Sequence, residues 1–178
     1  MSEISISALN ASQDICVKLG ELLVDVVANG GSVSFMHPLP LTVAIKFWQS
    51  SLAAAARGER IVLGAWAGTN LIGTVTLLLD CPPNQPHRGE IAKLMTRIDH
   101  RQRGVAAALV RAAEAIAVQH QRTLLVLDTA VEEGASVLYE RLGFIHAGTI
   151  PDYALKPHGG LTGTMIYWKR IGEKLPSP

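Results

Sequence analysis

The chain has 178 residues, a formal net charge of +1 and 48% apolar residues. This length and composition are typical of one globular domain, here 1–178, and exclude a disordered chain. The small net charge gives no general attraction to nucleic acid or to an anionic membrane. No apolar run reaches the roughly 18 residues of a membrane-spanning helix, and the first residues lack the basic and apolar regions of a signal peptide. With only two cysteines, no disulfide framework is expected, and we predict a cytoplasmic protein.

Apolar periodicity predicts a strand, two helices and a hairpin in the first half of the chain. Alternating apolar and polar residues indicate a half-buried strand, and apolar residues at steps of three and four indicate helices with one buried face. Both helices are followed by glycine, and Gly68-Thr69-Asn70 has the composition of a hairpin turn. The expected elements are strands over 4–9, 60–67 and 71–79, and helices from Asn10 or Ser12 to Gly30 and from Leu41 to about Gly58.

The second half predicts a buried strand between two helices, followed by two further strands. The run Leu124–Leu127 is continuously apolar, as in a strand covered on both faces. Loops are expected over 81–86, where three prolines remove backbone donors, and over Pro151–Gly160. The expected elements are strands over 91–98, 124–127, 144–149 and 162–169, helices from Val105 and over about 133–142, and a frayed tail from about 172. The resulting order, β-α-α-β-β-β-α-β-α-β-β, predicts a mixed α/β fold with helices on the faces of one sheet.

The stretch from Glu90 to Val110 joins a strand, a basic turn and a helix. A glycine at the turn permits positive φ and close approach of a ligand to the backbone. The unpaired N–H groups at the start of a helix, and the positive end of its dipole, suit a phosphate or pyrophosphate. We therefore predict an anion-binding cradle. Its expected residues are Arg101, Gln102, Arg103, Gly104, Val105, Ala106 and Ala107.

The cradle resembles the R/Q-x-x-G-x-G/A motif of the GNAT superfamily of N-acetyltransferases, which bind the pyrophosphate of acetyl-CoA with these amides. Leu138–Phe144 resembles the Y-E-x-x-G-F signature of the same superfamily, and the likeness covers nearly the whole chain. It implies the GNAT fold, with a single mixed, mostly antiparallel sheet, a central splayed parallel strand pair and about four flanking helices. It also implies an enzyme that transfers the acetyl group of acetyl-CoA directly to a primary amine.

Four shorter stretches are similar to the tabtoxin-resistance type of acetyltransferase, whose members acetylate a β-lactam amino-acid toxin. They are 29–36, 92–95, 127–129 and 166–167. The acceptor that this likeness implies is a small-molecule amine, such as an amino-acid-like toxin or antibiotic. A shared fold or motif does not by itself determine the substrate.

The resemblance gives catalytic roles to three side chains, each of which has an alternative explanation. Tyr139 would protonate the leaving thiolate, and the alternative is a tyrosine of the core. Glu90 lies fourteen residues before Gly104 and Asp128 eleven residues before Tyr139, and either carboxylate would act as the general base. The alternatives are a solvated carboxylate at Glu90 and a helix-capping aspartate at Asp128.

Further residues are expected to bind the two substrates. The strand residues Leu94, Met95 and Thr96 match those that pair with the pantetheine arm and face the acetyl oxygen in relatives. Two segments, 32–40 and 151–160, are expected to shape the acceptor pocket, because loops carry specificity on such scaffolds. Candidate substrate-binding residues within them are Phe35, Asp152 and Tyr153.

The chain departs from the superfamily pattern at three positions. Ile98 replaces a common proline, Ala106 replaces the second glycine of the motif, and Glu132 replaces an asparagine that contacts the pantetheine arm. The change at Glu132 leaves open a second function, a non-catalytic acyl-CoA sensor or interaction module on the same fold. An enzyme that uses a longer acyl donor is a third possibility.

The sequence also indicates which other partners to expect. The six histidines are scattered without ligand spacing, so we predict no metal. The basic cluster Arg97–Arg103 is short and lacks interleaved aromatic residues, so we expect no nucleic-acid partner, and no membrane partner either. Both a monomer and a homodimer are compatible with the sequence.

Overall fold

The sheet predicted from the sequence is present in the computed structural model, which describes residues 4–131 and 134–172. In chain order the elements are β1 (Ile4–Ala8), α1 (Gln13–Ala28), α2 (Leu41–Ala56), β2 (Arg60–Ala67), β3 (Asn70–Leu78), β4 (Arg88–Thr96), the 3₁₀ helix η1 (Ile98–His100), α3 (Val105–Gln119), β5 (Leu124–Ala130), α4 (Ser136–Arg141), β6 (Ile145–Leu155) and β7 (Leu161–Arg170). Within the described ranges the sheet has seven strands in the order β1-β2-β3-β4-β5-β7-β6. Its neighbours are antiparallel, apart from the parallel pair β4 and β5. The predicted element order and fold class are confirmed.

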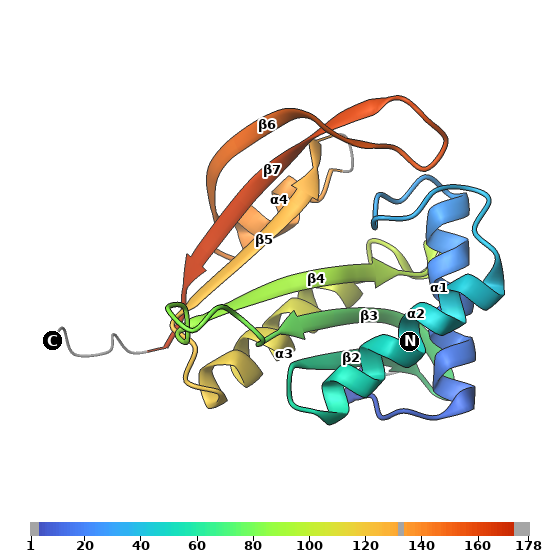
Figure 1. Ribbon diagram of the computed structural model, residues 1–178, viewed down its shortest axis with the longest axis horizontal. Helices are drawn as coiled ribbons and strands as arrows, with labels where there is room; N and C mark the ends of the chain where they lie inside the picture. Colours follow the sequence, from blue (N-terminus) through green and yellow to red (C-terminus); the bar gives the residue numbers. More distant parts are fainter. Residues whose placement is uncertain (1–3, 132–133, 173–178) are drawn as a thin grey trace, which may run out of the picture.

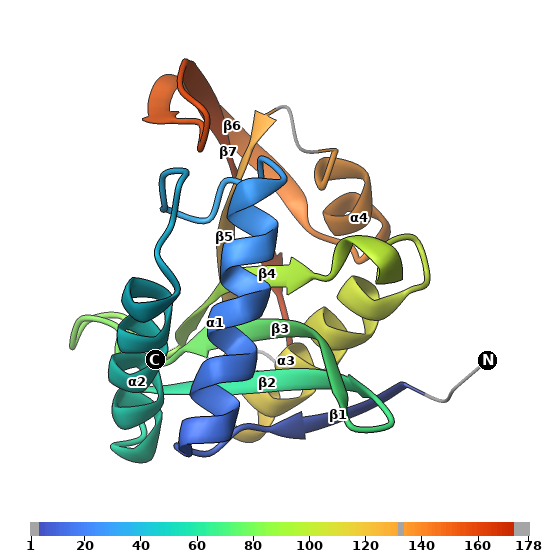
Figure 2. The ribbon, with the colours of Figure 1, turned by 90° about the vertical axis from the view of Figure 1, so that its right-hand side faces the viewer.

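Helices cover both faces of this sheet (Figures 1 and 2). Helices α1 and α2 bury side chains such as Leu22 and Trp48 in one hydrophobic cluster with β2 and β3. Helices α3 and α4 contribute Leu109 and Tyr139 to a second cluster, which contains residues of β2 to β5 and β7. In the part of the chain that the structure describes, no helix has both the length and the hydropathy needed to cross a membrane.

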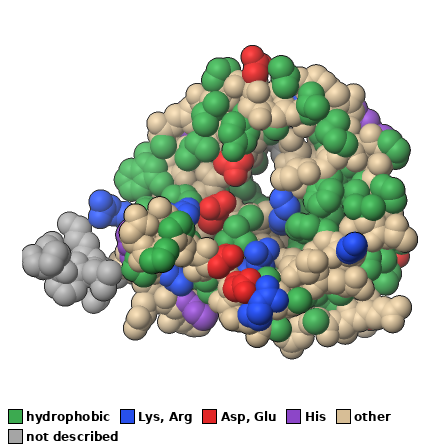
Figure 3. All heavy atoms as spheres, in the orientation of Figure 1, with side chains coloured by type: hydrophobic (Ala, Val, Ile, Leu, Met, Phe, Trp, Pro, Cys, Tyr) green, Lys and Arg blue, Asp and Glu red, His purple; other side chains and the backbone are tan. Residues whose placement is uncertain are grey.

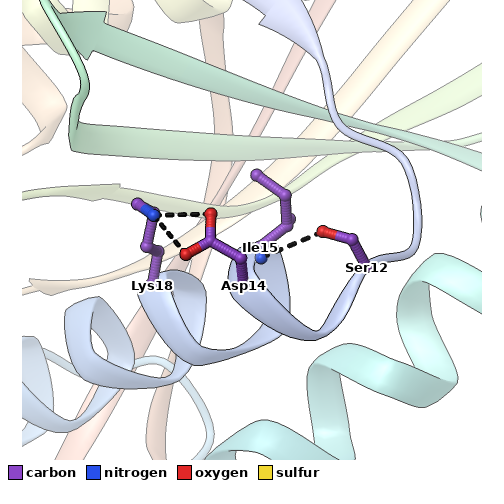
Figure 4. Close-up of polar contacts among 4 residues, drawn as sticks. All are labelled: Ser12, Asp14, Ile15 and Lys18. Atoms are coloured by element: carbon purple, nitrogen blue, oxygen red, sulfur yellow. Dashed lines mark hydrogen bonds and ion pairs between the residues drawn. The ribbon is translucent and has the colours of Figure 1, made fainter.

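Helix α1 begins after Ser12, one of the two predicted caps. The Ser12 Oγ accepts a hydrogen bond from the Ile15 backbone N–H at 3.2 Å (Figure 4). Such a cap satisfies one unpaired donor of the first turn and contributes about 1 kcal/mol. Lys18 and Asp14 form an i,i+4 ion pair at 2.5 Å on the exposed side of the helix, where such pairs contribute little. Residue 12, rather than Asn10, therefore sets the start of α1.

The prediction of a loop over Pro151–Gly160 is wrong for the first half of this segment, because β6 continues to Leu155. Strand β6 is the edge of the sheet, and an edge strand tolerates a proline whose missing N–H would face solvent. The register of β6 with β7 shifts between Ile150 and Ala154. Asp152 lies within this irregularity, with a left-handed φ of 50°. The connecting loop is therefore limited to 156–160.

The second half of the chain also differs from the expected boundaries. Strand β5 extends beyond Leu127 to Ala130, because β7 provides pairing partners for these additional residues. Strand β4 begins at Arg88 and ends at Thr96, and the expected strand residue Ile98 lies in η1. Helix α4 is shorter than predicted, and the expected helix start at 133, like Glu132, lies outside the described residues.

The first turn of α3 lies close against β3 because Gly73 has no side chain. A Cβ atom at Gly73 would lie 2.9 Å from the Met95 carbonyl oxygen and 3.0 Å from Val105 Cγ1. Distances this short force the surrounding backbone or side chains to move. Gly73 thus fixes how closely the N-terminal end of α3 approaches the middle of the sheet.

We expect the substitution Gly73→Ala to lower the free energy of unfolding by about 1–3 kcal/mol, because the added methyl overpacks this contact. Chemical denaturation measures the change. Gly148→Ala is the matched control, since a Cβ there meets nothing within 4 Å, and we expect a change within about 0.5 kcal/mol. Equal changes in the two variants would contradict close packing of α3 on Gly73.

Candidate active site

Strands β4 and β5 pair over three residues and then separate. The parallel register runs from Arg88↔Leu124 to Glu90↔Val126, whereas β4 continues to Thr96 and β5 to Ala130. After these paired residues the two strands diverge (Figure 1). A cleft of about 1140 Å³ is lined by residues of both strands. The space-filling view shows a hollow in this face of the molecule, with acidic and basic side chains nearby (Figure 3).

The N-terminal end of α3 forms one part of the cleft wall. Gly104 is the N-cap, with a left-handed φ of 80°, and Ala108 N donates to the Gly104 carbonyl at 3.0 Å. The amides of Val105, Ala106 and Ala107 precede this donor, and amides in the first turn of a helix have no intrahelical acceptor. All three residues line the cleft. Together with the positive end of the helix dipole, they form a site suited to an anion.

Positively charged side chains gather near this helix start. Arg101 and the neutral Gln102 line the cleft as predicted, whereas Arg103 is exposed and lies outside the lining. Two lining arginines were not predicted, Arg111 in α3 and Arg141 at the end of α4. The position of Arg141 depends on how α4 packs against the rest of the fold, and no local sequence signal marks that arrangement. Arg111 lies in α3 itself.

Strand β4 is irregular where it lines the cleft. Its register with β3 shifts between Thr74 and Thr76, and Lys93 has a left-handed φ of 51°. Ile91 and Leu94 therefore face the cluster that contains α3, while Met95 joins the cluster of α1 and α2. The predicted residues Leu94, Met95 and Thr96 all line the cleft. The bulge breaks the simple alternation of a strand.

Lys93 is a lining residue that was not predicted. Its Nζ donates a hydrogen bond to Ser34 Oγ at 3.0 Å and lies 5.9 Å from the centroid of the Phe47 ring. Burial lowers the pKa of the Lys93 ammonium, and the negative charges of Asp128 and Glu90 oppose that shift. The available sequence signal was a single lysine inside the apolar run 91–95.

The two candidate carboxylates have different surroundings. Asp128 lines the cleft, and its Oδ2 accepts a hydrogen bond from Thr164 Oγ1 at 3.1 Å. Because Asp128 lies within β5, it does not cap a helix. Glu90 lies in the paired part of β4 and outside the lining, and its Oε2 accepts a hydrogen bond from Arg88 Nη1 at 3.1 Å. Of the two, Asp128 has the position from which a carboxylate can reach a molecule in the cleft.

Tyr139 reaches the cleft wall from α4. The residue is only 5% exposed, and its ring centroid lies 5.8 Å from that of Phe144 and 5.9 Å from that of Tyr167. Aromatic neighbours at these distances hold a ring in a defined position. Tyr139 is therefore a core residue that also lines the cleft, and its role as the acid stays a prediction.

The two predicted acceptor segments both contribute to the cleft lining and contact each other. The His37 N–H donates to the Pro157 carbonyl at 2.9 Å, and the rings of His37 and His158 lie 4.5 Å apart. His158 Nε2 also lies 3.0 Å from the Ala28 carbonyl oxygen at the end of α1. We call these three contacts the bridge between the α1–α2 loop and the β6–β7 hairpin.

The three predicted substrate residues have different places relative to the cleft. Tyr153 lines it and is 57% exposed. Phe35 lies outside the lining, because its ring packs edge-on against Phe47 with centroids 5.2 Å apart. Asp152 also lies outside the lining. From the same two segments, Ser34 and Leu155 line the cleft instead.

The cleft thus combines amide donors and arginines at the start of α3 with a carboxylate, a lysine and a tyrosine elsewhere in its wall. Such a site can bind a phosphorylated compound and move protons at a second molecule. Within 4–131 and 134–172, no group of three His, Cys, Asp or Glu side chains is placed to hold a metal ion.

Comparison with known proteins adds a family and similar structures. The chain is similar to an N-acetyltransferase from Staphylococcus aureus Mu50 (TM-score 0.79, 18% identity, 95% of this chain and 99% of that chain covered). It is also similar to a ribosomal-protein-alanine N-acetyltransferase from Brucella melitensis (0.77, 18%, 93% and 99%). A third similar structure is YncA from Salmonella typhimurium with its cofactor acetyl-CoA (0.76, 14%, 95% and 95%). At these identities the likeness shows a shared fold.

The sequence model of the acetyltransferase (GNAT) family matches residues 33–144, which include β4, α3 and α4. Since this match covers more than half of the sequence, the chain belongs to the acetyltransferase (GNAT) family.

Proposed function

We propose that the protein transfers the acetyl group of acetyl-CoA directly to a primary amine of a small molecule. The start of α3 carries this proposal, because the amides of 105–107 and the Arg101 guanidinium suit a pyrophosphate. A Cβ atom at Gly104 would meet nothing within 4 Å, so a ligand has room above the helix start. Acetyl-CoA supplies the activated acetyl thioester. The YncA structure with acetyl-CoA supports this choice of donor.

The separation of β4 from β5 provides room for the pantetheine arm. Beyond Glu90 the β5-facing edge of β4 no longer pairs with β5, so its backbone groups can pair with an extended ligand. Leu94, Met95 and Thr96 lie in this part of the strand and line the cleft. One amide of this strand segment would donate a hydrogen bond to the acetyl oxygen as negative charge develops there, and such a donor contributes roughly 3 kcal/mol.

Asp128 and Tyr139 would move the protons of the reaction. An amine enters as an ammonium ion at neutral pH, and the Asp128 carboxylate would accept its proton directly or through water. Tyr139 would donate its hydroxyl proton to the sulfur as the C–S bond breaks. We favour Asp128 over Glu90 as the base, because Asp128 lines the cleft whereas Glu90 pairs with Arg88 outside it.

Two observations support a small acceptor. The stretches similar to the tabtoxin-resistance type include 29–34, 92–95 and 128–129, all of which line the cleft, and this supports an amino-acid-like amine. The α1–α2 loop and the β6–β7 hairpin both line the cleft, and the bridge joins them, which favours a small molecule over a folded protein. The Brucella relative, named for an alanine of a ribosomal protein, makes a protein acceptor the rival.

Release of free thiol from acetyl-CoA with a panel of small amines tests the function. We expect turnover with at least one amine, whereas a non-catalytic acyl-CoA sensor would bind acetyl-CoA without releasing thiol.

Tyr139→Phe should lower kcat by about 10- to 100-fold, because the leaving thiolate loses its acid. The KM for acetyl-CoA should change by less than about threefold, since the phenyl ring keeps its packing.

Tyr167→Phe is the control for this variant. Its ring lies beside Tyr139, but its hydroxyl donates to Glu140 Oε1 at 3.2 Å and the residue lies outside the cleft lining. We expect nearly normal kcat in this variant. A similar loss in both variants, or none in Tyr139→Phe, would remove the proposed acid role.

Gly104→Asp should weaken the binding of coenzyme A by more than about 100-fold, because a carboxylate would stand beside the pyrophosphate. Calorimetric titration with coenzyme A measures the affinity. Gly104→Ala places a residue with an uncharged side chain at the same left-handed φ. The smaller loss of coenzyme A affinity expected in this variant reports backbone strain alone. Unchanged affinity in Gly104→Asp would show that this helix start does not bind the pyrophosphate.

Asp128→Asn should lower kcat/KM for the amine by at least about 100-fold, because the amide cannot accept the ammonium proton. Glu90→Gln should lower it by less than about threefold. Steady-state kinetics with varied amine at saturating acetyl-CoA compare the two variants. The opposite order of losses would move the base from Asp128 to Glu90.

A further inference from the structure

Lys93 lies on a different face of the sheet from the start of α3. Its side chain contacts Ser34 of the α1–α2 loop and Phe47 of α2, whereas α3 packs on the opposite face. Asp128 follows Leu127, which belongs to the α3-side cluster, so strand alternation turns Asp128 toward the Lys93 face. The charges of Lys93 and Asp128 are close enough to influence each other.

The Lys93 ammonium has hydrogen-bonding capacity that the structure leaves for a ligand. An ammonium group carries three donors, and Ser34 Oγ accepts one of them. Among the described residues, no carboxylate is close enough to form an ion pair with Nζ. A half-buried cation in this state is stabilised by an anion that enters the cleft.

Both partners of this hydrogen bond have strained backbones. Lys93 has a φ of 51° and Ser34 a φ of 74°, and neither residue is a glycine. Side chains in the left-handed region cost energy and persist where surrounding structure holds them, commonly at functional sites. The strain at Lys93 comes with the β4 bulge, and its side chain contacts Ser34, which also lines the cleft.

We propose that Lys93 binds an anionic group, such as a carboxylate, of the acceptor, while Asp128 faces the amine of the same molecule. The favoured acceptors are therefore zwitterionic amines, and Lys93 is a specificity-determining residue. The anion is not the pyrophosphate of the donor, because the helix start that suits the pyrophosphate belongs to the other face of the sheet. This inference rests on the proposed function of the cleft.

The competing explanation gives Lys93 an internal role, in which it only balances the charges of Asp128 and Glu90. The two explanations predict different kinetics. A lysine that balances internal charge affects every amine similarly, whereas one that binds an acceptor anion affects only amines that carry the anion.

The test compares L-alanine, L-serine, L-leucine, L-phenylalanine and L-glutamine with their carboxamides, which keep the amine but lose the carboxylate charge. In the wild type we expect at least one acid to exceed its carboxamide in kcat/KM by about 10- to 100-fold. In Lys93→Met, which keeps the length of the side chain, that ratio should fall to about 1. The loss should lie in the acid alone, with the carboxamide and the KM for acetyl-CoA changed less than about threefold.

Two control variants separate charge from packing. Ser34→Ala removes the hydrogen-bond partner but keeps the ammonium, so the preference for the acid should persist. Lys93→Arg keeps the positive charge and should retain part of the preference. Calorimetric titration of the same acids and carboxamides into the complex with coenzyme A measures the preference independently of turnover.

The outcomes distinguish this inference from the proposed function. Absence of thiol release with every amine would contradict the function, and the titration would still decide whether Lys93 binds a carboxylate. Equal affinity or equal kcat/KM for acid and carboxamide in the wild type would overturn the inference while leaving the enzyme intact. Equal losses for acid and carboxamide in Lys93→Met, or no binding of any acid, would also overturn it.

Discussion

The cleft depends on one constraint, the short parallel pairing of β4 and β5. After Glu90↔Val126 each strand obtains its hydrogen bonds from its outer neighbour, β3 for β4 and β7 for β5. The sheet therefore remains continuous at one end while it opens at the other, and backbone groups of β4 face the opening. Two walls of the cleft are therefore strands of one sheet, and loop residues such as 29–34 complete the lining. Strand pairing thus places the main walls of the site.

The sheet also separates two kinds of charge. On the α3 side, main-chain amides and arginines form a positive region that suits phosphate. On the α2 side, Lys93 and Asp128 provide one charge of each sign. Two ligands of different charge can therefore occupy one cleft without competing for the same groups. Gly73 contributes to this division, because it lets the start of α3 lie directly against β3.

Local signals predicted the element order and the cradle, because helix caps, hairpin turns and glycine before a helix act through neighbours in sequence. Lys93 was not predicted, since a bulge depends on how β3 pairs with β4 and leaves no mark in the apolar pattern. Phe35 was predicted to bind the substrate only because it lies in a loop. In the structure its ring packs against Phe47 and lies outside the cleft lining. Pro151 suggested a loop, but only the sheet order shows that its strand is an edge. The catalytic roles of Asp128, Glu90 and Tyr139 remain predictions. The geometry favours Asp128 over Glu90 as the base, because Asp128 lines the cleft and Glu90 does not.

The bridge between the α1–α2 loop and the β6–β7 hairpin affects which molecules we expect to reach the cleft. His37, Pro157 and His158 join segments that lie more than a hundred residues apart in sequence, so the backbone around that end forms a closed ring. We expect a small molecule to enter the cleft without breaking these contacts, whereas a polypeptide segment that enters from this end would have to break them. These contacts are the structural reason for which we propose a small acceptor rather than a polypeptide.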